Sequence, residues 1–154
     1  MIPEILHVYD MNETNMLSRF LEAQQHTYDK ALIEIKSGKK RGHWMWYIFP
    51  QIKGLGFTET SKYYAIKDLG EATEYLKTPI LRNRLVEISN ALLQLDTRDA
   101  FAVFGSPDEL KLKSSMTLFS STPNSDPVFA HVISEFFDGN KDEKTLHLLA
   151  QDHI

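Results

Sequence analysis

Residues 36–57 read KSGKKRGHWMWYIFPQIKGLGF, and the rest of the chain is best interpreted outward from this stretch. Four cations lie within its first six residues, and a run of aromatic and apolar side chains follows that includes both tryptophans of the protein. It contains no Asp or Glu, although the formal net charge of the chain is -4. Cations beside aromatic rings are the groups with which proteins bind an anion attached to a planar ring, such as a nucleotide.

The composition is that of an ordinary globular protein. A length of 154 residues predicts a single domain over residues 1–154, with an N-terminal arm at 1–13 and a helical core at 14–150. The chain has no cysteine, which excludes disulfides and thiol chemistry and fits a cytoplasmic protein. No basic-then-apolar leader opens it, and no apolar run approaches the roughly 20 residues of a membrane span. We therefore expect no membrane partner.

Charge is distributed unevenly along the chain. Residues 36–67 hold seven cations and one anion, which makes this segment about +6 and leaves about -10 for the remainder. An acidic protein with one basic segment is a poor candidate for binding double-stranded nucleic acid. The asymmetry favours a local site for a small anionic ligand.

Apolar residues recur at helical spacing through most of the sequence. We expect a long helix from about residue 14 to 37, ended by Gly38, and further helices over 71–76, 79–95, 98–104, 107–119, 127–137 and the C-terminal segment. Thr60 or Ser61 caps a short helix. Ser106 with Glu109, and Asn140 with Glu143, have the spacing of capping boxes. The expected fold is mainly α, a compact bundle of about six or seven helices with little or no strand.

The first candidate site residues are the cations after Gly38. Backbone amides near Lys40 and Arg41 are placed to form an anion-binding nest, and the Arg41 guanidinium can grip a phosphate with two parallel hydrogen bonds. The alternative is a solvated helix end, in which the same charges stabilise the negative end of the helix dipole.

The aromatic run supplies the second group of candidates. Trp44 or Trp46 can stack on a base, and Gln51 can bind a base edge or a ribose. His43 has a pKa range suited to a general acid or base. The competing interpretation makes the tryptophans core residues, His43 a structural group and Gln51 a turn residue.

A third group lies around residue 111. If this segment is helical, Lys111 shares a face with Ser114 and Ser115, and the three are good partners for phosphate oxygens. Asp108 is a candidate proton carrier, with helix capping as the alternative role. Histidines lack ligand spacing on any helix, so we expect neither a metal site nor a cofactor.

The sequence also resembles a known family. The runs HWMWYIFPQ and KLKSSMTLF, with YYAIKDLGEATEYL, LRNRL and VFGSPDEL, are similar to the bacterial domain of unknown function 1810 across roughly residues 16–150. This implies a compact, mostly helical domain without an established activity. Some members are labelled calpastatin, but true calpastatins have long disordered repeats that this chain lacks. In general character the sequence is also similar to NADAR-type domains, although no residue motif carries that analogy.

The sequence therefore supports three hypotheses. The first is a cleft that binds, with or without hydrolysis, a nucleotide or an ADP-ribose-like molecule. The second is a non-catalytic module that presents its Trp-rich surface to a protein partner of unknown type. The third, with the least support, is binding of single-stranded nucleic acid to the same surface.

Overall fold

The structure, a computed structural model, describes residues 17–151, and its regular elements are helices together with one isolated β-bridge. The helices are one over residues 17–25, α2 (Tyr28–Lys36), α3 (Met45–Ile48), α4 (Glu59–Tyr63), α5 (Leu69–Lys77), α6 (Pro79–Leu93), α7 (Ala100–Phe104), α8 (Asp108–Ser120), α9 (Pro127–Phe137) and α10 (Glu143–Gln151). The mainly α class is confirmed, but six or seven helices were too few, since ten occur in the described residues. The predicted N-terminal arm lies outside the described residues.

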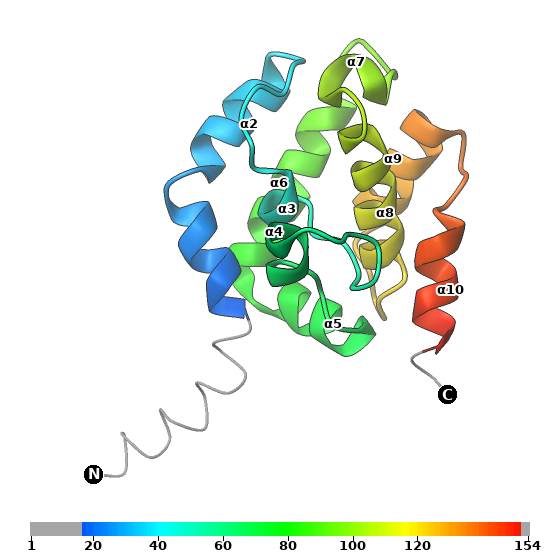
Figure 1. The fold of residues 1–154 in the computed structure, drawn as a ribbon. Coiled ribbons are helices and arrows are strands. Elements are labelled where there is room, and N and C mark those ends of the chain that lie inside the picture. Colours follow the sequence, from blue (N-terminus) through cyan, green and yellow to red (C-terminus); the bar gives the residue numbers. More distant parts are fainter. Residues whose placement is uncertain (1–16, 152–154) are drawn as a thin grey trace.

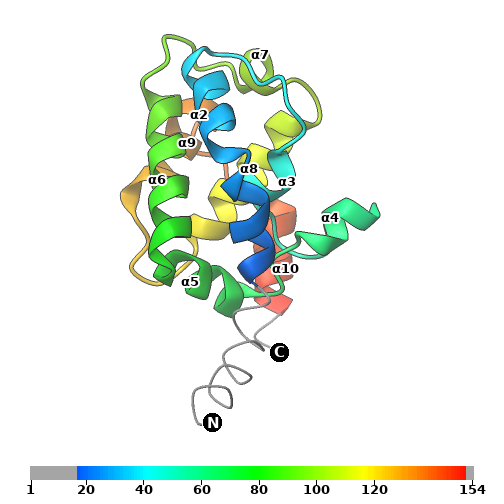
Figure 2. The same cartoon turned by 90° about the vertical axis from the view of Figure 1, so that its left-hand side faces the viewer.

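Helix α8 forms the centre of the bundle (Figure 1). Most of it is buried from Leu112 to Phe119, and it packs against α5, α7, α9 and α10. Helix α6 packs against α2, α5 and α9 (Figure 2). Two of the hydroxyls on α8 bond to carbonyls one turn earlier, Ser114 to Leu110 at 3.1 Å and Thr117 to Lys113 at 2.8 Å, whereas the buried Ser115 hydroxyl has no partner among the described residues.

Several expectations about helix ends were wrong, including the cap of the short helix α4, which is Thr58 and not Thr60 or Ser61. The predicted helix from 14 to 37 is interrupted at residues 26 and 27, where the Thr27 amide bonds to the Gln24 carbonyl at 3.1 Å. The interruption lies next to a tertiary contact, since the side-chain Nε2 of Gln24 donates to the Tyr47 carbonyl at 2.8 Å. Tertiary contacts of this kind override helix propensity.

The capping boxes also differ from the prediction. Pro107, and not Ser106, occupies the N-cap position of α8. Before α10, Asp142 replaces the expected Asn140, because its carboxylate accepts the Thr145 amide at 3.0 Å. The predicted stop at Gly38 is confirmed, and its φ of 84° is the left-handed conformation that favours glycine at a helix end.

The segment between α3 and α5 leaves the bundle and returns to it. Ile52 and Ile66 form a parallel bridge, in which the Lys53 amide donates to the Ile66 carbonyl and the Ile66 amide to the Gln51 carbonyl, both at 2.8 Å. Between them lie a glycine-containing loop and α4, which has no buried residue. Figure 2 shows α4 standing out from the body of the protein.

Candidate functional site

The basic turn after α2 encloses a carboxylate that belongs to the protein itself. Oε1 of Glu34 accepts hydrogen bonds from the amides of Arg41 at 2.7 Å and Gly42 at 2.9 Å, and from the indole Nε1 of Trp44 at 2.9 Å. Burial opposes ionisation of Glu34, but these three donors and the charge of Lys40 hold the pKa of its carboxyl below the ordinary value. The expected nest therefore exists, but Glu34 occupies it.

Trp44 is a core residue, with 1% of its surface exposed. Its ring lies against the turn so closely that a Cβ on Gly42 would come within 2.8 Å of the indole Cδ1, which explains the glycine at this position. The indole N–H is satisfied by Glu34, as a buried tryptophan requires. Trp44 is thus unable to stack on a ligand, and the core interpretation applies to it.

Lys40, Asp108 and Lys111 form a cluster of three charges. Nζ of Lys40 lies 2.9 Å from Oδ2 of Asp108, and Nζ of Lys111 lies 3.3 Å from Oδ1. The Lys40 side chain is only 8% exposed, and Nζ also donates to the Gly42 carbonyl at 2.5 Å. Lys40 and Asp108 therefore join the basic turn to the start of α8. This cluster leaves one surplus positive charge, which we assign to the more exposed Lys111.

Trp46 borders a hollow on the surface of the protein. Its ring is half-buried, and Nζ of Lys111 lies 5.1 Å from the ring centroid, a cation–π contact. The hollow, called here the Trp46 pocket, has a volume of about 330 Å³. It is lined by Trp46, Gln51, Ile52, Lys53, Gly54, Gly56, Phe57, Ser61, Lys62, Tyr64 and Ala65.

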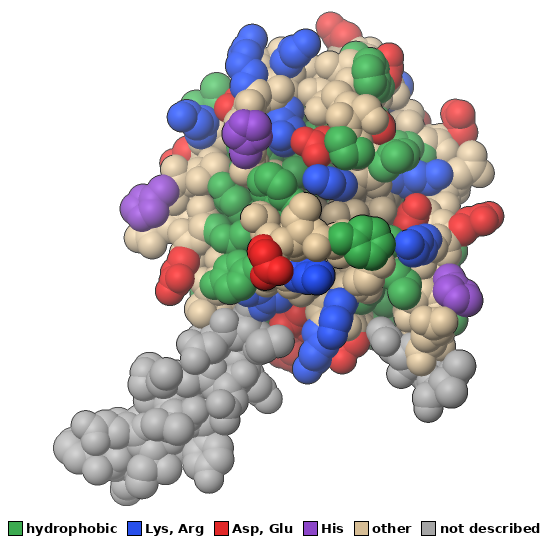
Figure 3. Space-filling view, viewed as in Figure 1, with side chains coloured by type: hydrophobic (Ala, Val, Ile, Leu, Met, Phe, Trp, Pro, Cys, Tyr) green, Lys and Arg blue, Asp and Glu red, His purple; other side chains and the backbone are tan. Residues whose placement is uncertain are grey.

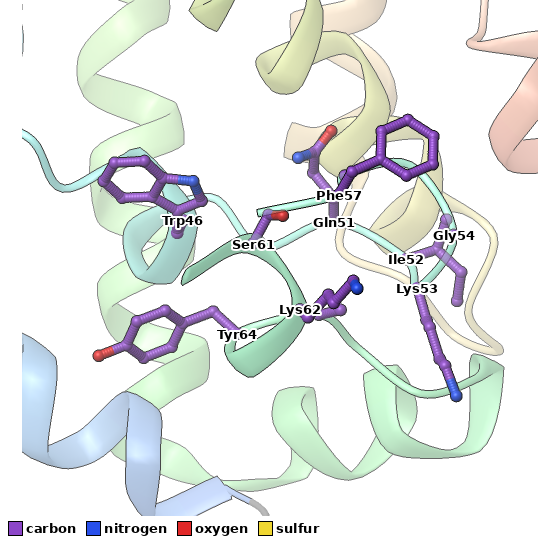
Figure 4. Close-up of a pocket in the computed structure, with 11 residues that line it drawn as sticks. Trp46, Gln51, Ile52, Lys53, Gly54, Phe57, Ser61, Lys62 and Tyr64 are labelled. Atoms are coloured by element: carbon purple, nitrogen blue, oxygen red, sulfur yellow. The ribbon is translucent and has the colours of Figure 1, made fainter. Parts of the chain in front are cut away.

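The lining of the Trp46 pocket combines rings with positive charge. Figure 4 shows Trp46 and Tyr64 at one side and Phe57 at the other, with Lys62 between them. None of the described residues that line it is an acid or a histidine. On the face seen in Figure 3, apolar side chains gather over α3 and α4, and lysines and arginines lie among them.

A shallower groove adjoins the pocket and shares Trp46 and Tyr64 with it. It contains His43 and Glu59 and has a volume of about 540 Å³. His43 is exposed, so it can meet a ligand that extends out of the Trp46 pocket. Asp108, the other candidate proton carrier, forms ion pairs with Lys40 and Lys111 and is therefore held as their counter-charge.

The structure brings only some of the predicted site residues together. Trp46 and Gln51 line the pocket, and Lys111 contacts Trp46. Ser114 and Ser115 are buried in α8, with Ser115 wholly inaccessible, so neither can reach a ligand in the pocket. The exposed Arg41 side chain does not line it, and Lys40 is paired with Asp108.

Sequence reasoning missed several residues that do line the pocket: Lys53, Phe57, Ser61, Lys62 and Tyr64. Lys53 and Lys62 both belong to the positively charged segment 36–67. That charge excess was a signal for them, but it did not distinguish them from the cations of the turn at 39–41. Within residues 17–151, no three histidine, aspartate or glutamate side chains gather closely enough to hold a metal ion. None of the helices in that range combines the length and apolar character that a membrane span requires.

Comparison with known proteins agrees with the resemblance seen in the sequence. The family model described as "Protein of unknown function (DUF1810)" matches residues 14–149. The crystal structure of the conserved hypothetical protein Rv1873 from Mycobacterium tuberculosis is similar to this chain, with a TM-score of 0.85 and 40% sequence identity over 87% of this chain and 96% of that one. No curated protein matches the chain. The match over most of its length establishes that the chain belongs to the DUF1810 family of proteins of unknown function.

Proposed function

We propose that the protein binds a small molecule in which an aromatic ring is attached to a phosphate, such as a nucleotide, in the Trp46 pocket. The observation that supports this is the lining of the pocket, where aromatic rings and two lysines border an apolar hollow that no acidic residue of the described chain enters. A planar ring can stack on Trp46 or Tyr64, while the Lys62 ammonium attracts phosphate. Gln51 can donate to and accept from the polar edge of the ring.

The size of the pocket favours a small ligand. Its volume of about 330 Å³ lies at the lower end of the range for ligand sites, which fits a mononucleotide better than a dinucleotide. A longer molecule such as ADP-ribose would have to extend into the groove beside His43. Because none of the described residues that line the pocket carries a carboxylate or an imidazole, we propose binding and assign no hydrolytic step to it.

Thermal unfolding in the presence of ligands tests this proposal. AMP, ADP, ATP and ADP-ribose are each added in excess, with inorganic phosphate as the comparison, and at least one nucleotide should raise the Tm. Isothermal titration then gives the Kd. Trp46→Ala should weaken binding by about tenfold or more, since a stacked base is worth about 1–3 kcal/mol.

A second test replaces a lysine that lines the pocket, and its matched control replaces a lysine outside the pocket. Lys62→Met should raise the Kd severalfold, and Lys30→Met, on the exposed side of α2, should leave it unchanged. If no nucleotide stabilises the protein, or if both pocket variants bind as the wild type does, the proposal is wrong.

The exposed rings beside the pocket favour one alternative function. Phe57 is 81% and Tyr63 59% exposed, and large rings at the surface often contact a protein partner. A pull-down that loses its partner in Phe57→Ala, from a protein indifferent to nucleotides, would support this alternative. Affinity for a single-stranded oligonucleotide that falls steeply with salt would instead indicate nucleic-acid binding.

A further inference from the structure

We propose that Arg19 is a positioning residue for the Trp46 pocket: it holds α4, which forms one wall, in the place that ligand binding requires. The ligand in this inference is the one named in the proposed function. The positioning role itself is argued from the contacts of Arg19. Arg19 lies on the helix at residues 17–25 and does not line the pocket. It acts on the pocket through the backbone of a distant segment.

The guanidinium of Arg19 binds the chain at the last residue of α4 and again two residues later. Its Nε donates to the Tyr63 carbonyl at 2.8 Å, and its Nη2 donates to the Ala65 carbonyl at 2.9 Å and to Oε1 of Glu71 at 3.2 Å. Oε1 of Glu71 also accepts the Lys67 amide at 2.8 Å. One planar group thus holds the whole turn from α4 into α5, which the single ammonium of a lysine cannot do.

Arg19 itself is held rigidly. It is buried, and its guanidinium carbon lies 4.4 Å from the centroid of the Phe20 ring, which is fully buried. Because the side chain is fixed between this ring and the Glu71 carboxylate, it provides a defined attachment point instead of a mobile surface contact.

Helix α4 depends on such an attachment because it contributes nothing to the core. None of its residues is buried, and it stands out from the body of the protein (Figure 2). Its N-terminal end is capped within the same segment, where the Thr58 hydroxyl accepts the Ser61 amide at 3.1 Å. The described contacts that connect it to the bundle lie beyond its C-terminal end, at Tyr64 and at the Ile52–Ile66 bridge, next to the carbonyls that Arg19 binds.

The position of α4 determines the shape of the pocket. Ser61, Lys62, Tyr64 and Ala65 come from α4 and its C-terminal end, and the rest of the lining comes from α3 and residues 51–57. If α4 moves relative to Trp46, the ring and charge contacts of a ligand can no longer be made together. Releasing Arg19 should therefore weaken binding even though every pocket side chain remains.

Hydrogen exchange on the free protein tests the clamp without any ligand. In Arg19→Lys, the amides of residues 62–66 should exchange about tenfold faster, while those of α8 should change less than about twofold. Arg98→Lys is the matched control. Like Arg19, the Arg98 guanidinium binds backbone carbonyls and a glutamate. Its partners are Leu93, Leu95, Thr97 and Glu135, which are distant in the sequence from the residues that line the pocket. It should leave residues 62–66 unchanged.

The nucleotide Kd then distinguishes the two proposals. We expect Arg19→Lys to raise the Kd about tenfold and Arg98→Lys to leave it unchanged. Unaltered exchange at 62–66, or exchange that rises equally in every helix, would overturn the positioning role. So would local loosening with an unchanged Kd. If the wild-type protein binds no nucleotide, the proposed function fails and the ligand role of Arg19 fails with it, whereas the exchange result still decides whether Arg19 fastens α4.

Discussion

Replacing Glu34 with alanine should lower the free energy of unfolding by about 2–3 kcal/mol, one of the two largest effects we expect from a single substitution. The reason is the loss of one acceptor for three donors, among them the indole N–H of Trp44, a residue with 1% of its surface exposed. The amides of Arg41 and Gly42 lose the same partner. Urea unfolding, followed by tryptophan fluorescence at neutral pH, measures the change.

A glutamate elsewhere provides the control for this substitution. Glu22→Ala removes an exposed carboxylate from the helix at residues 17–25 and should change the stability by less than about 0.5 kcal/mol. If Glu34→Ala costs no more than Glu22→Ala, the enclosed carboxylate is not what orders the basic turn.

Acid should remove the contribution of Glu34 in a predictable direction. Its pKa is lower in the folded protein than in the unfolded chain, so the stabilisation is fully present above the unfolded value of about 4.3 and is lost as the pH falls through the folded value. The stability difference between the wild type and Glu34→Gln should therefore shrink between about pH 6 and about pH 3. A difference that stays constant over this range would contradict the lowered pKa.

Replacing Asp108 with asparagine should cost about 2–4 kcal/mol, because it leaves the buried ammonium of Lys40 without its counter-charge. The pair joins the basic turn to α8, so the turn should loosen as well. Chemical denaturation measures the loss. Raising the salt concentration should recover little of it, since a pair this poorly exposed is weakly screened.

A double variant tests whether the buried charge is the cause. Lys40→Met removes the ammonium, so Lys40→Met combined with Asp108→Asn should be more stable than Asp108→Asn alone. Lys111→Met serves as the comparison, because Lys111 pairs with the same carboxylate from a more exposed position and should not rescue it. If the double variant is less stable than Asp108→Asn, the pair acts through packing and not through charge.

Local sequence patterns predicted the positions of most helices, but not the tertiary contacts between segments far apart in the chain. Apolar spacing located α6 and α9 because one buried stripe per helix is visible in the sequence itself. The break at residues 26 and 27 has no such signal, since no glycine or proline marks it. The tertiary contact next to the break joins the Gln24 side chain to the carbonyl of Tyr47, about twenty positions away along the chain. A single sequence does not reveal that contact.

The same limit applies to the candidate site. The amides after Gly38 do surround an anion, but that anion is the Glu34 carboxylate of α2, which no sequence motif singles out as their partner. Arg19 carried no sequence signal at all, because its partners lie 44 to 52 residues along the chain. Trp44 and Trp46 are alike in the sequence, and only the three-dimensional arrangement makes one a core residue and the other the wall of a hollow.

The bridge between Ile52 and Ile66 closes the base of an excursion that carries most of the proposed pocket. The chain between those two residues is tied to the helix at residues 17–25 near its end, where Arg19 binds the Tyr63 and Ala65 carbonyls and Tyr64 contacts Phe20. Insertions, deletions or exchanges within residues 54–62 should therefore reshape the lining of the proposed pocket while the helices of the scaffold fold as before.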